Sequence, residues 1–279
     1  MVLRPLRPVP LPGRAQAIYD DWLQMIEGRL AEPEADWYAL CREVLFEIWH
    51  PGQGSYADAK PTTPTAQAAL AALDPHCITL EPEYYAEVDV AKFARVKPLL
   101  WLWYSFDRSP MGGQHVDLGV RLRRLLAPRI FARCGANFKA FQHVEFSFGY
   151  NMEVGDDVVV HRHVLLDDRG GITLGNRVSI SDYANLYSHT HSIVDQLEVT
   201  DARTVLEDDV RITYHATVLA GNRIGRNGMV GALALATKDV KPYHVNVGIP
   251  AKSVRVKPNA PPEVYVTERV SRRVEREDS

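Results

Sequence analysis

From Leu206 onward an aliphatic or small residue recurs every six positions, with mostly polar residues between. The repeating residues are Leu206, Ile212, Val218, Ile224, Val230 and Ala236. An α-helix needs apolar residues three or four apart and a half-buried strand needs strict alternation, so neither explains this period. A fixed hexapeptide period is the signature of a parallel β-helix, in which short strands wind around a prism and stack turn upon turn. We therefore expect each recurring residue to point into a continuous core.

The same phase continues toward the N-terminus, but it is interrupted twice. Two sets of three residues spaced six apart precede the regular stretch: Val154, Val160 and Leu166, then Leu174, Ile180 and Leu186. Two extra residues separate the sets, and a larger insertion spans about residues 188–205. If three hexapeptides make one triangular turn, both insertions leave the prism at the same corner. Binding and catalytic residues concentrate on such loops, so this corner is the predicted site.

The first half of the chain has a helical periodicity instead. The spacing of its apolar residues predicts helices over 14–30, from Pro33 to the turn at 51–52, over 66–73, and over 118–131 with an interruption at Pro128. The predicted organisation has four parts. These are a helical or mixed N-terminal region of unknown role (1–110), a helical lead-in (111–143), a β-helix domain of about four turns (144–257) and a charged C-terminal tail (258–279).

Composition excludes some classes of function. The formal net charge of −3 gives no electrostatic case for nucleic-acid binding. The longest apolar run, PLLWLWY at 98–104, is far too short to span a bilayer. The three cysteines are widely spaced and form neither a metal-binding nor a disulfide pattern, so we expect a protein of the reducing cytoplasm.

Three short motifs carry a resemblance to a known family. TKDVKP at 237–242 and GIPAK at 248–252 follow the hexapeptide repeats in the order and at the spacing found in the hexapeptide-repeat acyltransferases. YSHTH at 187–191 opens the larger insertion and resembles the loop of the sugar O-acetyltransferases of the galactoside and maltose acetyltransferase type. In those enzymes a Thr-His pair carries the catalytic histidine. The lead-in helix and the NMEVGDD phrase after it also resemble acetyltransferases of exopolysaccharide synthesis.

The resemblance covers about residues 144–257 and implies both a fold and an activity. The implied fold is a left-handed β-helix that assembles as a homotrimer. The implied activity is O-acylation of a carbohydrate-like acceptor, with acetyl-CoA or another acyl-CoA as co-substrate and no metal. Neither the acceptor nor the acyl group is defined by these motifs.

Transfer of an acyl group from a thioester to a hydroxyl needs a base that takes the proton of the attacking hydroxyl. Histidine suits this role because it titrates near neutrality. The resemblance gives His191 the place of the catalytic histidine, and His189, two residues earlier, is the alternative. Asp167 and Asp168 lie in the smaller insertion, one turn before His189 at the same corner. We expect these carboxylates to bind hydroxyls of the acceptor or to orient the histidine.

The resemblance places the coenzyme along the last turns of the β-helix. The predicted coenzyme-binding residues are Tyr214, Ala232, Thr237, Lys238, Lys252 and Arg255. Basic side chains suit this role because the phosphates of coenzyme A need cationic partners. Tyr214 replaces a small residue that is common at this place in the family, which leaves the acyl donor open.

Three other classes of protein stay open. A helical region before a β-helix also resembles serine acetyltransferase, although the DHATG element and the GGTG loop of that enzyme are missing here. His161, His163 and His215 resemble the zinc-binding histidines of γ-carbonic anhydrases, without the surrounding Arg, Asp and Gln framework. A noncatalytic β-helix scaffold is expected if Tyr214 blocks the coenzyme groove.

Overall fold

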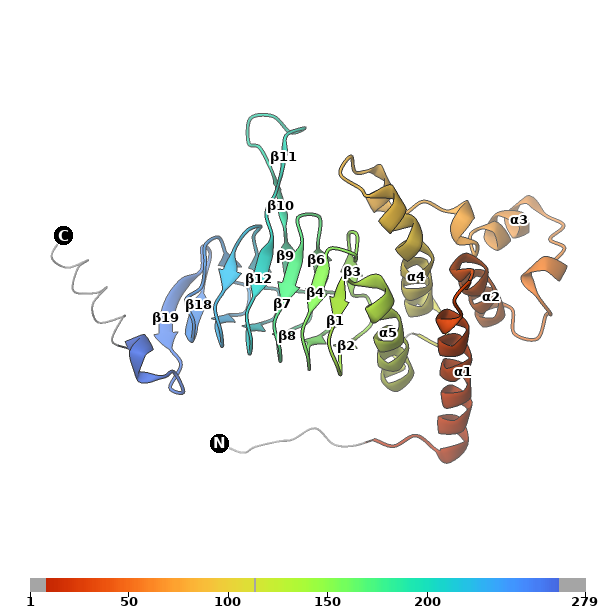
Figure 1. Cartoon of the computed structure of the whole chain (residues 1–279), viewed down its shortest axis with the longest axis horizontal. Coiled ribbons are helices and arrows are strands. Elements are labelled where there is room, and N and C mark those ends of the chain that lie inside the picture. Colours follow the sequence, from red (N-terminus) through yellow and green to blue (C-terminus); the bar gives the residue numbers. More distant parts are fainter. Residues whose placement is uncertain (1–8, 113, 266–279) are drawn as a thin grey trace.

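A computed structural model describes residues 9–112 and 114–265 of the chain. An N-terminal helical region packs against one end of a parallel β-helix, and a single hairpin projects from the middle of that β-helix (Figure 1). In the described part of the chain, no helix is both long enough and apolar enough to cross a membrane. Most of the charged tail predicted over 258–279 lies outside the described residues.

The N-terminal region is mainly helical, as predicted. Its α-helices are α1 (Gly13–Ala31), α2 (Trp37–Trp49), α3 (Pro64–Ala71), α4 (Val90–Arg108) and α5 (Val116–Ile130), with 3₁₀ turns η1 (Tyr56–Asp58), η2 (Pro75–Cys77) and η3 (Glu81–Tyr84). Asp36, Thr63 and Asp89 are the N-cap residues of α2, α3 and α4, and each side chain accepts a hydrogen bond from a backbone N–H in the first turn. The expected interruption at Pro128 is wrong, because α5 continues through this residue to Ile130.

The β-helix consists of three parallel sheets, one on each face of the prism. The first contains β1 (Arg133–Cys134), β4 (Met152–Val154), β7 (Ile172–Leu174), β12 (Thr204–Leu206) and β15 (Arg223–Ile224). The second contains β2 (Lys139–Ala140), β5 (Val159–Val160), β8 (Ser179–Ile180), β13 (Arg211–Ile212), β16 (Met229–Val230) and β18 (His244–Val247), with β19 (Lys252–Val256) antiparallel at its edge. The third contains β3 (Glu145–Phe146), β6 (Leu165–Asp167), β9 (Asn185–Tyr187), β14 (Thr217–Val218) and β17 (Leu235–Ala236).

The hexapeptide prediction of the core is confirmed. All six recurring residues from Leu206 to Ala236 are at most 1% exposed, and partners one turn apart, such as Leu166 and Leu186, pair directly. The prism is longer than predicted, because its first turn begins at Arg133 rather than near residue 144. The repeating positions of that turn hold Cys134, Ala140 and Phe146, without any of the Val, Leu or Ile residues that mark most later turns, so the pattern did not reveal it.

Side chains of the helical region cover the exposed edge of the first turn. Backbone carbonyls at this edge have no preceding strand to pair with, and an uncovered edge invites pairing with other chains. Trp103 Nε1 donates to the Val144 carbonyl at 3.1 Å, and Arg124 Nε donates to the Phe138 carbonyl at 2.8 Å. Arg123 donates to the Ala140 carbonyl at 3.1 Å while its guanidinium is ion-paired with buried Asp107. The helices α4 and α5 therefore act as a cap on the β-helix.

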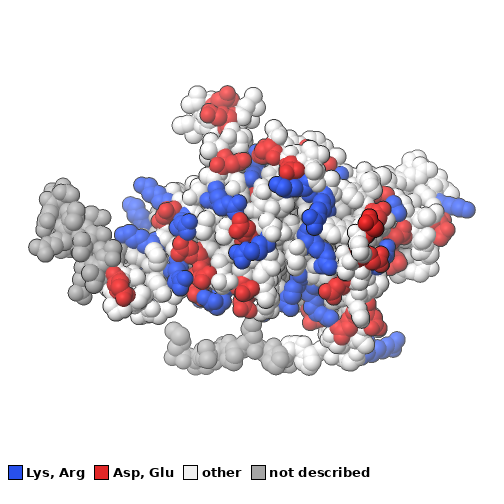
Figure 2. All heavy atoms as spheres, in the orientation of Figure 1, with Lys and Arg blue, Asp and Glu red and all other residues white. Residues whose placement is uncertain are grey.

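Charged side chains of both signs are intermixed over the face of the β-helix shown in Figure 2. Ion pairs join different turns on its surface, as between Arg203 and Glu153, two turns apart, at 3.1 Å and between Arg223 and Glu207, one turn apart, at 2.8 Å. This face of the β-helix therefore carries no large surface of a single charge.

Candidate active site

Three insertions leave the prism at one corner, directly after the third-face strands β3, β6 and β9. The second and third were predicted, and their common corner follows from the register that pairs β6 with β9. The first, residues 147–151, was missed, although the interval of eight between Phe146 and Val154 signals it. The third insertion forms a hairpin of β10 (His189–His191) and β11 (Val199–Asp201), which is the projection seen in Figure 1.

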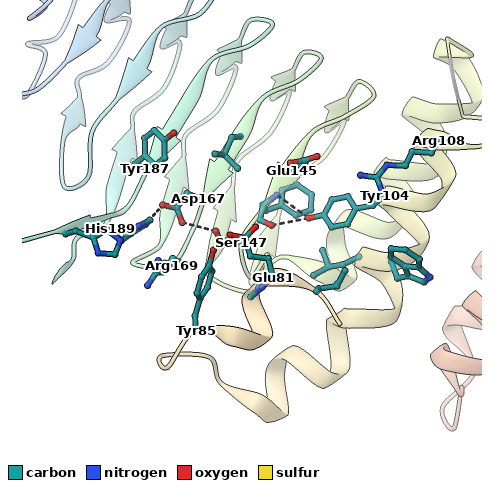
Figure 3. Close-up of a pocket in the computed structure, with 17 residues that line it drawn as sticks. Glu81, Tyr85, Tyr104, Arg108, Glu145, Ser147, Asp167, Arg169, Tyr187 and His189 are labelled. Atoms are coloured by element: carbon teal, nitrogen blue, oxygen red, sulfur yellow. Dashed lines mark hydrogen bonds and ion pairs between the residues drawn. The ribbon is translucent and has the colours of Figure 1, made fainter. Parts of the chain in front are cut away.

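Each of the three turns of the β-helix that carry these insertions contributes one residue, at or next to the insertion, to a chain of hydrogen bonds (Figure 3). Ser147 Oγ donates to Oδ1 of Asp167 at 2.8 Å. Oδ2 of the same carboxylate contacts Nδ1 of His189. Asp167 is 2% exposed, so both of its oxygens are engaged by protein groups and largely shielded from water. The arrangement orients His189 with a buried carboxylate, which was one of the two roles predicted for Asp167.

His189 and His191 lie on the same strand but have different partners. Residues two apart point to the same face of a strand, and both histidines line the same cavity. Their rings meet edge to face with centroids 5.3 Å apart. His191 is exposed, and its Nδ1 lies 3.0 Å from the carbonyl oxygen of Gln196 within the hairpin. Among the described residues, the carboxylate contact belongs to His189.

Asp168 has a structural position that the sequence prediction did not foresee. It is fully buried and accepts backbone hydrogen bonds from Phe148 at 2.7 Å and Asn151 at 3.2 Å. Burial raises the pKa of this carboxyl to about 6. Because the side chain holds the first insertion in shape and does not line the cavity, its predicted contact with an acceptor is not available.

Close backbone packing keeps the second and third insertions together. Ser188 Oγ donates to the Asp167 carbonyl at 2.5 Å and accepts from the Gly170 N–H at 2.9 Å. A Cβ at position 170 would lie 2.2 Å from the Ser188 carbonyl oxygen, so only glycine fits there. This contact fixes the start of the hairpin, and with it the position of His189 relative to Asp167.

The Asp167–His189 pair borders a cavity of about 630 Å³. The opposite wall comes from the N-terminal region, which the sequence did not assign to the site. Its side chains in the cavity include Glu81, Tyr85, Leu100, Trp101, Tyr104 and Arg108. A concave, largely apolar space with a few converging polar groups is the usual form of a small-molecule site.

The six predicted coenzyme residues lie on the last turns of the β-helix, and all are exposed. Tyr214 and Ala232 occupy the same corner on successive turns, where the Leu233 N–H donates to the Tyr214 carbonyl at 2.9 Å. Thr237 and Lys238 follow β17, at the corner from which the hairpin leaves two turns earlier. Lys252 and Arg255 lie on β19. Tyr214 is 57% exposed on this surface.

The histidines considered for zinc are arranged as a stack of rings. The Tyr183 ring lies between His163 and His215, with centroid distances of 4.8 and 4.9 Å. These residues share a left-handed backbone conformation at the same corner of successive turns, so their rings repeat at the spacing of parallel strands. His163 and His215 are therefore held apart by Tyr183 and do not converge within one chain. His161 stacks on Phe141 instead, at 5.0 Å.

Comparison with known proteins gives both sequence relatives and structural neighbours. No protein-family model matches the chain. The galactoside O-acetyltransferase of Escherichia coli K12 is 28% identical over 158 residues, which is 55% of this chain and 75% of that protein. A maltose O-acetyltransferase from Clostridium difficile 630 superimposes with a TM-score of 0.54 at 23% identity, covering 62% of this chain and 91% of the neighbour. A hexapeptide-repeat acetyltransferase from Vibrio cholerae complexed with acetyl coenzyme A gives 0.53 at 24% identity, with coverage of 62% and 90%.

These matches leave more than a third of the chain without a counterpart. They agree with the fold expected from the hexapeptide period and from the closing motifs. The chain therefore has the left-handed β-helix fold of the hexapeptide-repeat acetyltransferases and is similar in sequence to galactoside O-acetyltransferase.

Proposed function

We propose that the protein transfers an acetyl group from acetyl-CoA to a hydroxyl of a carbohydrate-like acceptor, with His189 as the general base. The observation that supports this proposal is the hydrogen-bonded series Ser147–Asp167–His189 at the cavity. When Nδ1 of a neutral imidazole donates to a carboxylate, Nε2 carries the lone pair and is free to accept a proton. The relatives act on galactosides or maltose by name, which supports a sugar as the acceptor.

In this mechanism a hydroxyl of the acceptor attacks the carbonyl carbon of the acetyl thioester, and its proton moves to Nε2 of His189. The Asp167 carboxylate stabilises the imidazolium that forms. When the tetrahedral intermediate collapses, the carbon–sulfur bond breaks and the thiolate leaves as coenzyme A. The imidazolium returns the proton to that thiolate, which restores the neutral histidine. No covalent enzyme intermediate is needed.

The choice of His189 over His191 can be tested with two variants. We expect His189→Ala to lower kcat by about 10²- to 10⁴-fold, the usual contribution of a general base. His191→Ala is the matched control on the same strand, and its kcat should stay within about tenfold of the wild type. The assay measures release of the free thiol of coenzyme A with galactosides and maltose as acceptors. If His191→Ala alone abolishes transfer, the base is His191. Transfer that survives in both variants refutes a histidine base at this hairpin.

For the coenzyme we propose the open surface of the last turns, formed by Tyr214, Ala232, Thr237, Lys238, Lys252 and Arg255. Its basic side chains suit the phosphates of coenzyme A, and its exposure leaves room for a long ligand.

We also propose that the active assembly is a homotrimer. Ile193, Val194 and Leu197 at the tip of the hairpin are each at least 88% exposed, and a second copy of the chain would remove these apolar groups from water. Light scattering on the purified protein should give three times the mass of one chain. We expect Ile193→Asp to weaken the assembly. If the wild-type protein has the mass of a single chain, the homotrimer is refuted.

A further inference from the structure

The cavity beside His189 is closed by a part of the chain that has no counterpart in the predicted site. Segment 80–85 and one side of α4 line it opposite the Asp167–His189 pair. Figure 3 shows Arg108 and Glu145 at the far side of this space from His189. The space therefore extends well beyond the single hydroxyl that the base must reach.

The wall from the N-terminal region is firmly attached to the insertions. Arg169 of the second insertion is ion-paired with Glu87, and its guanidinium lies 4.1 Å from the centre of the Tyr85 ring. In the first insertion, the Tyr150 hydroxyl accepts a hydrogen bond from the Asp89 N–H at 2.9 Å. These contacts join residues more than 60 positions apart in sequence. They present a preformed binding surface, so little of the protein has to become ordered when a ligand binds.

The far part of the cavity offers both donors and acceptors of hydrogen bonds next to aromatic rings. Glu145 and Arg108 are exposed, and neither side chain forms an ion pair or hydrogen bond with another described residue. Trp101 and Tyr104 line the space beside them. A sugar hydroxyl both donates and accepts, so a carboxylate and a guanidinium suit neighbouring hydroxyls. The carbon–hydrogen faces of a sugar ring suit aromatic surface.

The charge of the lining disfavours an anionic ligand. Glu81, Glu145 and Asp167 are acidic, and Arg169 is already paired with Glu87. Arg108 is thus the one cation of the described lining, histidines aside, without an acidic partner. An uncharged ligand meets this set of groups without repulsion.

We propose that this wall is a second sugar subsite, and that the acceptor is an uncharged oligosaccharide of two or more units. This inference rests on the proposed function. The reacting hydroxyl of the first unit lies at His189, and the next unit lies against Trp101 and Tyr104, where Glu145 and Arg108 bind its hydroxyls. The N-terminal helical region is then an acceptor-binding element of the enzyme, in addition to its role as a cap.

Direct binding tests the subsite independently of catalysis. Titration of the His189→Ala protein compares galactose with lactose and glucose with maltose, using calorimetry. At least one disaccharide should bind about tenfold more tightly than its monosaccharide, because each hydrogen bond to a charged group contributes about one factor of ten or more. Arg108→Ala and Glu145→Gln should each remove about tenfold of disaccharide affinity and leave monosaccharide affinity unchanged. Arg14→Ala and Glu47→Gln, at exposed positions of α1 and α2 outside the cavity, are the matched controls.

Kinetics separate this proposal from the proposed function. In wild type, the disaccharide should have the lower acceptor KM, and Arg108→Ala should raise that KM without changing kcat or the KM for acetyl-CoA. Equal affinities for mono- and disaccharides, or variants that weaken both equally, overturn the subsite while transfer to a monosaccharide still supports the proposed function. Disaccharide binding without any acetyl transfer has the opposite meaning: it supports the subsite and refutes the proposed function.

Discussion

Replacing Asp167 with Asn tests whether this carboxylate acts through His189. The amide keeps the shape of the side chain and an oxygen that accepts from Nδ1, but it removes the negative charge. The side chain of Asp167 is 3% exposed, so solvent screens that charge little. A hydrogen bond to a charged partner contributes about 1.5–3 kcal/mol, against about 1 kcal/mol for a neutral pair. Loss of the difference, about 0.5–2 kcal/mol, lowers kcat by about 2- to 30-fold.

The assay is thiol release at saturating acetyl-CoA and acceptor, and the KM for acetyl-CoA should not change. Ser147→Ala removes the other hydrogen bond to Asp167 while leaving the carboxylate in place, so it is the matched control and should cost less than about fivefold. The double variant Asp167→Asn/His189→Ala should be no slower than His189→Ala alone, because a positioning residue has no effect once its partner is gone. If the two losses multiply in the double variant, Asp167 does not act through His189.

Two further predictions concern stability and the coenzyme. Because the pKa of Asp168 is raised to about 6 in the folded protein, from 3.8 in the unfolded chain, the folded state binds its proton more tightly. This contribution to stability is present below about pH 4 and is lost as the pH rises through 6, amounting to about 3 kcal/mol. Urea denaturation of wild type and of Asp168→Asn gives the difference between their free energies of unfolding. This difference, wild type minus variant, should fall as the pH rises from 4 to 7. A difference that stays constant contradicts the burial argument. Lys238→Ala and Arg255→Ala should each raise the KM for acetyl-CoA about fivefold with kcat unchanged, an effect that shrinks at high salt. An unchanged KM in both variants would move the coenzyme to another surface.

The fold of the second half was predictable because the hexapeptide core is a local property repeated many times. Each turn buries the same few positions, so a period read from Leu206 onward fixes both the core and the corners. The first turn was missed because its repeating positions hold Cys134, Ala140 and Phe146, without any of the Val, Leu or Ile residues that make the period recognisable in most later turns. Helix α4 was missed for a related reason. It is buried on most sides and therefore lacks the amphipathic stripe by which a surface helix is recognised.

The candidate site was only partly predictable. The interruptions of the period located Asp167 and both histidines at one corner, and the resemblance favoured His191. The structure pairs His189 with Asp167, because β10 begins at His189 and Ser188 holds that start against the second insertion. The pattern of residues treats the two histidines alike, since they lie on one face of the same strand.

The sequence by itself determined a β-helix, its core and the corner where its loops gather, because these follow from spacing along the chain. Only the tertiary structure decided which loop residues touch and what closes the cavity. Ser147, Asp167 and His189 are about 20 positions apart, and Tyr85 and Arg169 are farther still. Contacts over such distances depend on the register between turns and on how the helical region docks on the first of them. No local period encodes that docking, which is set by buried contacts such as the hydrogen bonds from Arg123 to the Ala140 carbonyl and from Trp103 to the Val144 carbonyl.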